Sequence, residues 1–509
     1  MISKAPAPRR RVSPAANAAA DPSSRSADPR LHVLNAHDPA RDGAYVLYWC
    51  RAYRRASDNL ALDHAVRRAD ELGVPLLVYE ALDVRYPHAS DRIHRFVLEG
   101  ACEMRAPLEA RGIGYAFFLP RTAAEARDSK ALERLAARAC CVVTDWYPDV
   151  GGPRSLWAHT RRLAARLSCR MEAYDDAVVV PMSLLGKPEV GARTIRPKVH
   201  AALDAHLVMA EDRTPRHAMR ALPALPFEPT DIVAHRLDAL VAACHVDHDV
   251  APVADRVGGP HEARARLERF TTGVLRHYAE ERNDMARVAV SGLSPYLHFG
   301  HLSVRAVALV AREEERGGDG RDAFLEQLIV RRSLAFNWVM NQPLHTEYAS
   351  VPAWARDQLA KHADDPRPLA TDFSHWLAGE TGEALWNAAQ RELLRDGVIH
   401  PYARMLWGKV AITLAKNPED AFAWLVELND RFALDGRDPN TYASIAWCFG
   451  LHDRPFPGRA IFGTVRSMTT RSAAHKWDVS TYLARVGMAG ASLTTGQRDE
   501  FDQRTLWDD

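Results

Sequence analysis

From residue 44 onward, short apolar runs alternate with longer segments in which apolar residues recur with the period of a helix. Runs typical of strands cover 44–49, 75–79, 115–119 and 141–145, and helical patterns cover 59–72, 92–111 and 123–137. Strands that alternate with helices of this length predict a parallel, doubly wound sheet with helices on its faces. We therefore expect residues 41–181 to form an α/β domain.

The pattern changes twice after this domain. Residues 182–231 are rich in proline, which is typical of an extended linker that wraps over a surface. From 232 to 485 the apolar period is helical, with turns at glycine and proline, and this predicts a larger all-α domain that can bury a cofactor. Residues 1–40 are expected to be a disordered tail, because they offer no apolar core, and residues 486–509 a C-terminal tail.

Composition adds few constraints. The hydrophobic share of 47% and the charged share of 26% are ordinary for a globular protein. A net charge of +1 neither supports nor excludes nucleic-acid binding, since only a local basic face is needed. The basic cluster at residues 9–11 leaves a transit peptide or a DNA-contacting tail as alternatives to plain disorder.

Cysteine spacing and hydropathy bear on the compartment. The seven cysteines are scattered without CxxC spacing, so we expect reduced thiols, a cytoplasmic protein and no metal site. No apolar run approaches the ~20 residues that span a bilayer, so no membrane association is expected.

Aromatic residues stand at the ends of two predicted strands. Tyr48-Trp49 and Asp145-Trp146-Tyr147 lie at carboxyl ends, beyond which ligands of parallel sheets usually bind. The alternative is that Trp49 and Trp146 are core aromatics. No glycine-rich phosphate loop is visible, so a Rossmann dinucleotide site is not expected in this domain.

Two carboxylates, a turn and a large aromatic are concentrated near the C-terminal end. Asp435 and Asp438 are followed by Pro439-Asn440 and then by Trp447. Buried carboxylates need partners, because desolvating an unpaired charge is costly. A pair of them beside a tryptophan therefore indicates a cofactor pocket. The alternative is a surface Asx turn ahead of a core helix.

A second candidate for ligand binding is Ser291-Gly292-Leu293-Ser294-Pro295, which reads as a turn leading into a helix. Hydroxyl groups and free N–H groups at a helix start suit a phosphate. A plain helix N-cap is the alternative for this segment.

Six segments together carry a family resemblance. They are 193–198 (RTIRPK), 282–283 (RN), 291–300 (SGLSPYLHFG), 385–390 (LWNAAQ), 402–409 (YARMLWGK) and 434–440 (LDGRDPN). In this order, over roughly residues 44 to 470, the chain resembles class II cyclobutane pyrimidine dimer photolyases of the photolyase/cryptochrome family. The resemblance implies a deoxyribodipyrimidine photo-lyase with an antenna-type α/β domain and an all-helical, FAD-binding catalytic domain.

The resemblance also implies the cofactors and their binding residues. FAD would be held with its pyrophosphate on the serine-rich turn and with the Arg404–Asp435 ion pair beside the isoalloxazine ring. Asn429 would face N5 of the flavin and tune the ring, although without the family it reads as an ordinary helix-end residue. An antenna chromophore, a deazaflavin or a folate, would occupy the α/β domain. The implied FAD-binding residues are Tyr278, Arg282, Ser291, Gly292, Leu293, Ser294, Arg404, Asp435, Asp438 and Asn440.

The family reaction is electron transfer from light-excited, reduced FAD to a dimer flipped out of UV-damaged double-stranded DNA. A monomer is expected. Trp407 and Trp386 match two tryptophans of the family's photoreduction chain. Positions that line the dimer pocket match Ser333, Asn387, Met405 and Trp447.

Two substitutions depart from the family at positions that matter. Ser333 replaces a glutamate that hydrogen-bonds the dimer, so a charge-assisted bond worth roughly 1.5–3 kcal/mol is lost or rerouted. Leu414 replaces the third tryptophan, and Trp424 and Trp447 are the candidates to substitute for it. These changes leave an alternative open: a photolyase-like flavoprotein without repair activity, either a cryptochrome-like photoreceptor or a flavoenzyme with a small-molecule substrate.

Overall fold

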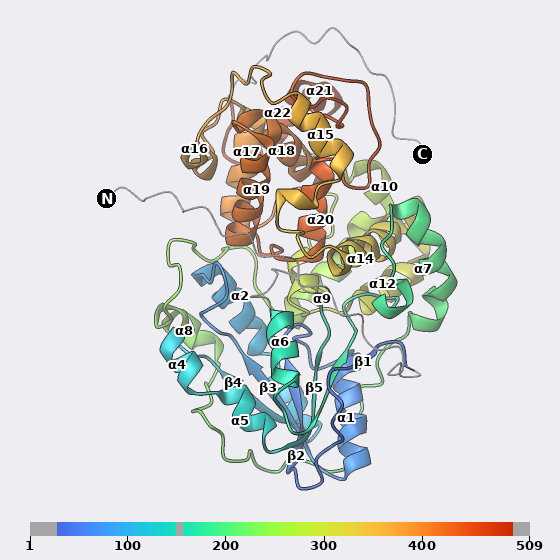
Figure 1. The fold of residues 1–509 in the computed structure, drawn as a ribbon, viewed down its shortest axis with the longest axis vertical. Helices are drawn as coiled ribbons and strands as arrows, with labels where there is room; N and C mark the ends of the chain where they lie inside the picture. Colours follow the sequence, from blue (N-terminus) through green and yellow to red (C-terminus); the bar gives the residue numbers. More distant parts are fainter. Residues whose placement is uncertain (1–27, 149–155, 492–509) are drawn as a thin grey trace.

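The computed structural model describes residues 28–148 and 156–491. The predicted basic cluster at 9–11, most of the N-terminal tail and residues 492–509 therefore lie outside the described residues. Figure 1 shows two domains that follow one another along the long axis, an α/β domain below and a helical domain above.

The α/β domain is built on a sheet whose order, within the described residues, is β1-β6-β5-β2-β3-β4. All neighbouring pairs from β6 to β4 are parallel. The central strands are buried along their whole length, which explains why they read as continuous apolar runs. The strands are β1 (Leu31–Val33), β2 (Tyr45–Cys50), β3 (Leu76–Ala81), β4 (Gly114–Phe118), β5 (Ala139–Asp145) and β6 (Arg170–Tyr174).

The predicted α/β class is confirmed, with one addition at the sheet edge. β1 runs antiparallel to β6, so the sheet is mixed. The predicted disordered tail is therefore wrong for Leu31–Val33, which is paired with 172–174. A strand of three half-buried residues carries no apolar alternation that the sequence could reveal.

Two predicted helices of this domain are interrupted. The predicted helix at 92–111 ends early because Glu103 and Met104 bond carbonyls three residues back instead of four. The predicted helix at 123–137 is broken at Lys130, whose φ of 43° is left-handed. The helices are α1 (Leu60–Leu72), α2 (Asp91–Ala101), α3 (Arg105–Ala110), α4 (Ala123–Asp128), α5 (Ala131–Ala136) and α6 (Leu156–Ala164).

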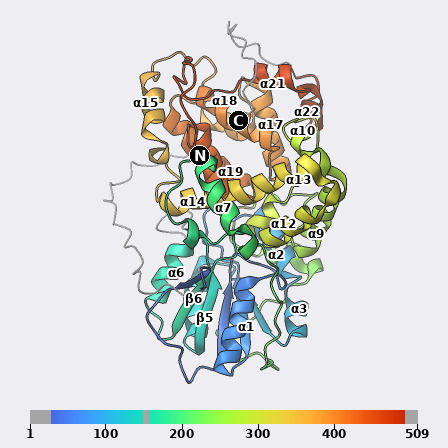
Figure 2. The same cartoon turned by 90° about the vertical axis from the view of Figure 1, so that its right-hand side faces the viewer.

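The predicted linker at 182–231 is only half extended. Its first half forms α7 (Ala192–His206), which Figure 2 shows in the middle of the molecule near α14. The Thr194 hydroxyl stabilises the first turn by bonding the Gly191 carbonyl at 2.9 Å, and Pro197 removes only its own backbone donor. Residues 207–231 have no helix or strand and run along the α/β domain, where the Thr230 amide bonds Phe117.

Between 232 and 491 the described regular elements are helical, apart from two isolated bridge pairs. The predicted boundary at 232 lies slightly too early, because residues 247–250 hydrogen-bond α2 of the first domain. The helices are α8 (Leu237–Ala242), α9 (Pro260–Arg269), α10 (Tyr278–Glu281), α11 (Ser294–His298), α12 (Val304–Glu313), α13 (Gly318–Leu325), α14 (Arg332–Asn341), α15 (Ala353–Lys361), α16 (Phe373–Ala378), α17 (Ala384–Asp396), α18 (Pro401–Leu414), α19 (Pro418–Phe432), α20 (Pro439–Cys448), α21 (Thr470–Lys476) and α22 (Val479–Arg485).

A buried carboxylate joins the two domains. Asp176, just after β6, is paired with Arg55 of the first domain and with Arg305 of α12 at 2.8 Å. Burial alone would raise the pKa of Asp176, but the charges of Arg305 and Arg55 outweigh it and hold the pKa below its ordinary value. Arg305 is fully buried and also pairs with Asp58 at 3.0 Å.

A second link crosses the junction at a helix end. Arg92 of α2 donates to the carbonyls of Phe432 at 2.6 Å and Leu394 at 2.6 Å, and to that of Leu393 at 3.2 Å. These carbonyls lie in the last turns of α17 and α19, where a cation is favourable.

We expect Asp176→Asn to lower the free energy of unfolding by about 3–5 kcal/mol, because it leaves buried guanidinium groups facing a neutral amide. Glu71→Gln is the control, since it removes only a surface partner of Arg68 and should cost about 0–1 kcal/mol. Thermal unfolding midpoints of the two variants check this. Equal midpoints would contradict the role given to Asp176.

Candidate functional site

Three of the predicted cofactor residues meet in one cluster. Arg404 of α18 pairs with Asp435 through both oxygens, at 2.8 and 3.2 Å, and the Ser294 hydroxyl lies close enough to Asp435 to favour its charged form. Burial alone would raise the pKa of Asp435, but the charge and hydrogen bonds of Arg404 and the hydroxyl of Ser294 hold it below its ordinary value. Ser294 is exposed although Asp435 is buried, so solvent reaches this cluster.

Asp438 is the N-cap of α20, and it is buried, so it is not the surface turn that was the alternative for this segment. One oxygen accepts from the Asn440 amides at 2.9 and 2.7 Å. The other accepts from the Tyr147 hydroxyl at 2.8 Å and lies 3.3 Å from His298 Nδ1. Burial alone would raise the pKa of Asp438, but His298 and the charge of Arg332 hold it well below its ordinary value.

The serine-rich turn lies beside two cations. Gly292 has a φ of +63°, and its carbonyl accepts from Arg256 at 3.1 Å. A Cβ at Gly292 would lie 3.7 Å from Arg256 Nη1 and 3.8 Å from Arg266 Nη1. Ser291 Oγ accepts from the Leu293 amide at 3.4 Å. Hydroxyl groups and guanidinium groups around an open turn suit a diphosphate.

Two buried polar atoms of the predicted site have no partner within the described residues. Asn429 is 1% exposed, and its amide nitrogen donates to Leu425 at 2.8 Å while Oδ1 has no hydrogen bond. Arg404 Nε is also buried without an acceptor. A free acceptor and a free donor fit a ligand such as a flavin, which offers ring N–H and carbonyl groups.

Tyr278 and Arg282 form a separate group. The Tyr278 ring packs edge-on against Phe270 and Phe324 at 5.8 and 5.5 Å, and the Arg282 guanidinium lies 5.7 Å from the ring centre. Within the part of the chain that the structure describes, no hydrogen bond joins them to Asp435.

The four predicted substrate residues differ in their exposure and in the hydrogen-bonding groups that remain free to bind a substrate. Trp447 and Met405 are both half-buried, and they lie on α20 and α18, two helices that pack against each other. Ser333 is fully buried, and its hydroxyl donates to the Ile329 carbonyl at 2.7 Å. The Asn387 oxygen accepts from the Thr381 hydroxyl at 2.7 Å and from the Thr381 amide at 2.9 Å, and its nitrogen donates to the Thr381 carbonyl at 2.8 Å.

Trp386 and Trp407 are stacked, with ring centres 5.7 Å apart and planes at 17°. The Trp386 N–H donates to the Trp407 carbonyl at 3.0 Å, which fixes the two helices in register. Leu414, the position of the missing tryptophan, is fully buried on the same helix as Trp407.

The aromatics predicted for an antenna site have other neighbours. Trp49 and Trp146 are buried, and the Trp146 ring stacks on His32 at 5.3 Å. Tyr147, which follows the same strand end, donates its hydroxyl to Asp438 in the helical domain. Arg256 and His298 were missed, because no spacing connects them to Asp435 or to the serine-rich turn.

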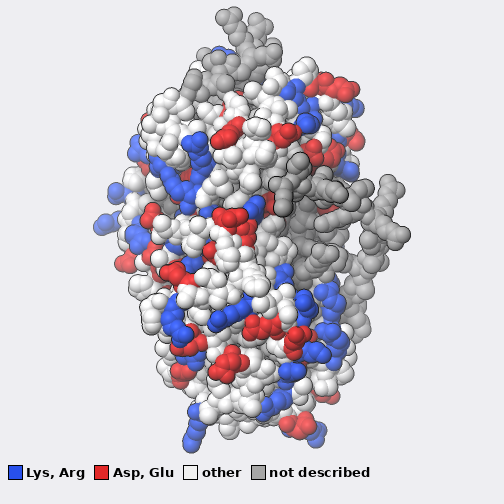
Figure 3. Space-filling model, turned by 90° about the vertical axis from the view of Figure 1, so that its left-hand side faces the viewer, with Lys and Arg blue, Asp and Glu red and all other residues white. Residues whose placement is uncertain are grey.

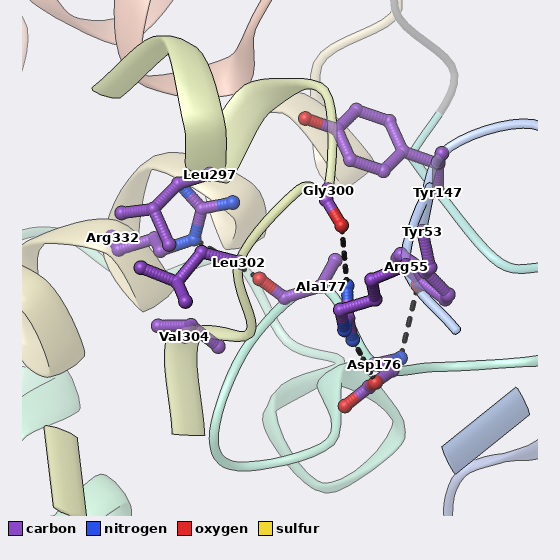
Figure 4. A pocket seen from close by; sticks show the side chains of 11 residues that line it. Tyr53, Arg55, Tyr147, Asp176, Ala177, Leu297, Gly300, Leu302, Val304 and Arg332 are labelled. Atoms are coloured by element: carbon purple, nitrogen blue, oxygen red, sulfur yellow. Dashed lines mark hydrogen bonds and ion pairs between the residues drawn. The ribbon is translucent and has the colours of Figure 1, made fainter. Parts of the chain in front are cut away.

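A cavity of about 10 Å³ lies between the sheet edge and the helical domain. Figure 4 shows Arg55 and Asp176 paired on one side of it, with Tyr147 and Arg332 also lining it. This space is about that of a single water molecule, far below the ~300–1,000 Å³ typical of ligand pockets. It belongs to the packed domain junction.

The described residues hold no group of three or more side chains that could bind a metal ion. None of the described helices is long and apolar enough to cross a bilayer. Figure 3 shows acidic and basic side chains interspersed over one face, in keeping with the low net charge.

Comparisons with known proteins identify the family and the fold. The family model for DNA photolyase matches residues 46–222. A deoxyribodipyrimidine photo-lyase from Methanothermobacter thermautotrophicus is 34% identical over 90% of this chain and 98% of its own length. The solved structures include a Synechocystis cryptochrome (TM-score 0.65, 17% identity, 88% and 89% of the two chains). They also include an archaeal photolyase from Sulfolobus tokodaii with two FAD molecules (TM-score 0.59, 16% identity, 86% and 89%). The chain, which carries the Arg404–Asp435 pair beside the serine-rich turn, therefore belongs to the photolyase/cryptochrome family.

Proposed function

We propose that this photolyase repairs cyclobutane pyrimidine dimers in UV-damaged double-stranded DNA, as class II enzymes do, with bound FAD. The observation that carries the proposal is the cluster of Ser294, Arg404 and Asp435 next to the helix that bears Trp447. Bound FAD would supply the light-absorbing electron donor. The relative named deoxyribodipyrimidine photo-lyase, which aligns over 90% of this chain, supports the same activity.

The residues of the chain divide the work of binding. Ser291 and Ser294 offer hydroxyl groups to a diphosphate, and the nearby Arg256 offsets its charge. Arg404, held in place by Asp435, would face the flavin ring, and the free Asn429 oxygen would accept a hydrogen bond from a ring N–H. The neighbouring Trp386 and Trp407 are buried and exclude water.

The lesion would stack on Trp447. This ring is half-buried, so one part stays accessible to a flipped base, and Met405 is half-buried on the neighbouring helix α18. Lys409 Nζ supports the ring at 4.7 Å from its centre. We further propose a monomer that acts in the cytoplasm, in which the seven cysteines are free thiols.

One observation favours the alternative of a photolyase-like flavoprotein without repair activity. The Ser333 hydroxyl is turned back onto Ile329 and is fully buried, so it offers no donor to a dimer. Ser333 follows a π-helical segment, Glu326–Arg331, an irregularity that is frequent at functional sites.

Ser333→Glu tests the lesion pocket. With chemically reduced protein, a thymine-dimer oligonucleotide and blue light, we expect repair by the unaltered protein and a roughly 10- to 100-fold higher repair rate for Ser333→Glu. That range corresponds to the roughly 1.5–3 kcal/mol of a hydrogen bond to a charged group. Ser333→Gln is the matched control of similar size without the acid. Flavin-loaded protein that repairs nothing, with or without the glutamate, would support the alternative.

Asp435→Asn tests the cofactor site. It leaves the Arg404 guanidinium without a charged partner, so we expect the dissociation constant of FAD to rise about 30-fold or more, the equivalent of roughly 2 kcal/mol. Asp396→Asn, at an exposed pair with Arg395, should bind FAD like the unaltered protein. Titration of the apo-protein with FAD measures both. An unchanged affinity of Asp435→Asn would rule out this placement of the flavin.

A further inference from the structure

Four tryptophans from four consecutive helices contact one another in a row. Trp407 of α18 stacks on Trp386 of α17, as described above. Trp386 then contacts Trp376 of α16, with ring centres 5.1 Å apart, and Trp376 contacts Trp424 of α19 at 4.9 Å. Of these helices, α16 lies at the edge of the helical domain, and α17, α18 and α19 lie further inside it (Figure 1). Electron tunnelling falls steeply with distance, so rings in direct contact are suited to relay an electron.

The row runs from the interior to the surface. Trp407 and Trp386 are each 1% exposed and Trp376 is fully buried, whereas Trp424 is half-buried. Trp407 lies one turn after Arg404 on α18, so the inner end of the row is next to the proposed flavin site. The outer end meets solvent.

Hydrogen bonding favours Trp424 as the ring that loses its N–H proton after it has given up an electron. An indole that has lost an electron becomes acidic at its N–H. The N–H groups of Trp407 and Trp376 are buried without an acceptor among the described residues, and that of Trp386 faces a backbone carbonyl, which is a weak base. Trp424 is the first ring of the row from which a proton can pass to water.

The other candidate named from the sequence, Trp447, does not join the row. Its ring lies against the Lys409 ammonium at 4.7 Å, and a positive charge there disfavours a cationic ring. Among the described residues its ring pairs with none of the four tryptophans.

We propose that Trp407, Trp386, Trp376 and Trp424 form an electron-transfer chain whose solvent-facing end is Trp424, in place of the route that Leu414 closes. The proposal rests on FAD binding under the proposed function. One electron leaves Trp407 for light-excited, oxidised FAD, and electrons from Trp386, Trp376 and Trp424 successively refill each vacancy. Trp424 releases its N–H proton to water, and a thiol in solution returns one electron and one proton to it.

Transient absorption of the flavin-loaded protein after a laser flash tests the chain, because it records the tryptophan radical and needs no DNA. Without Trp424 the radical cation stays on buried Trp376, and it is lost by back electron transfer toward the flavin. We therefore expect Trp424→Phe to shorten the radical lifetime about tenfold or more, a change of roughly 1.4 kcal/mol in activation free energy. Trp376→Phe should shorten it further, and Trp424→Tyr should restore part of it, because tyrosine is also redox-active.

Trp354→Phe is the matched control, since Trp354 is half-buried in the same core and forms no aromatic ring pair among the described residues. Its radical lifetime should equal that of the unaltered protein. An unchanged lifetime in Trp424→Phe, with a full flavin load, would overturn the chain and leave the proposed function intact. A protein that binds no flavin in the dark would overturn both, so the visible spectrum taken before the flash separates the two failures.

Discussion

Asp176 is the constraint on which the arrangement of the two domains depends. Its carboxylate meets Arg55 from one domain and Arg305 from the other, all out of contact with water. Separating buried charges of opposite sign is costly, so the sheet edge keeps one orientation toward α11 and α12. In that orientation Tyr147 reaches Asp438. The proposed cofactor site is therefore supported from both domains, although the residues assigned to it from sequence all lie in one.

The α/β class and most elements could be predicted from the sequence, because the central strands are buried on both faces and the helices keep one apolar stripe. Three features could not. β1 is too short to show a pattern and depends on pairing with β6. The high proline content of residues 182–231 predicted an extended segment. The helix α7 nevertheless forms there, because the one proline inside it, Pro197, removes only one backbone hydrogen bond. The break at Lys130 is a single left-handed residue.

The site divides in the same way. Arg404, Asp435 and Ser294 were predicted together because motif order carries them, and the structure places them in contact. Arg256 and His298 were missed, since only the fold brings them to the serine-rich turn and to Asp438. Ser333 and Leu414 could be recognised as departures from the family. Their consequences required the structure, because both depend on what the neighbouring side chains offer.

The Arg92 contacts bear on how the chain is made. Its acceptor Phe432 lies 340 residues further along. At about 5–20 residues per second, a ribosome takes roughly 17–68 s to synthesise that stretch. Because N-terminal domains generally fold first during synthesis, we expect the α/β domain to close its sheet within that time, while Arg92 still faces water. The charged guanidinium of Arg92 favours contact with water at this surface until the helical domain is made. The C-terminal ends of α17 and α19 then bind to a cation that is already in place.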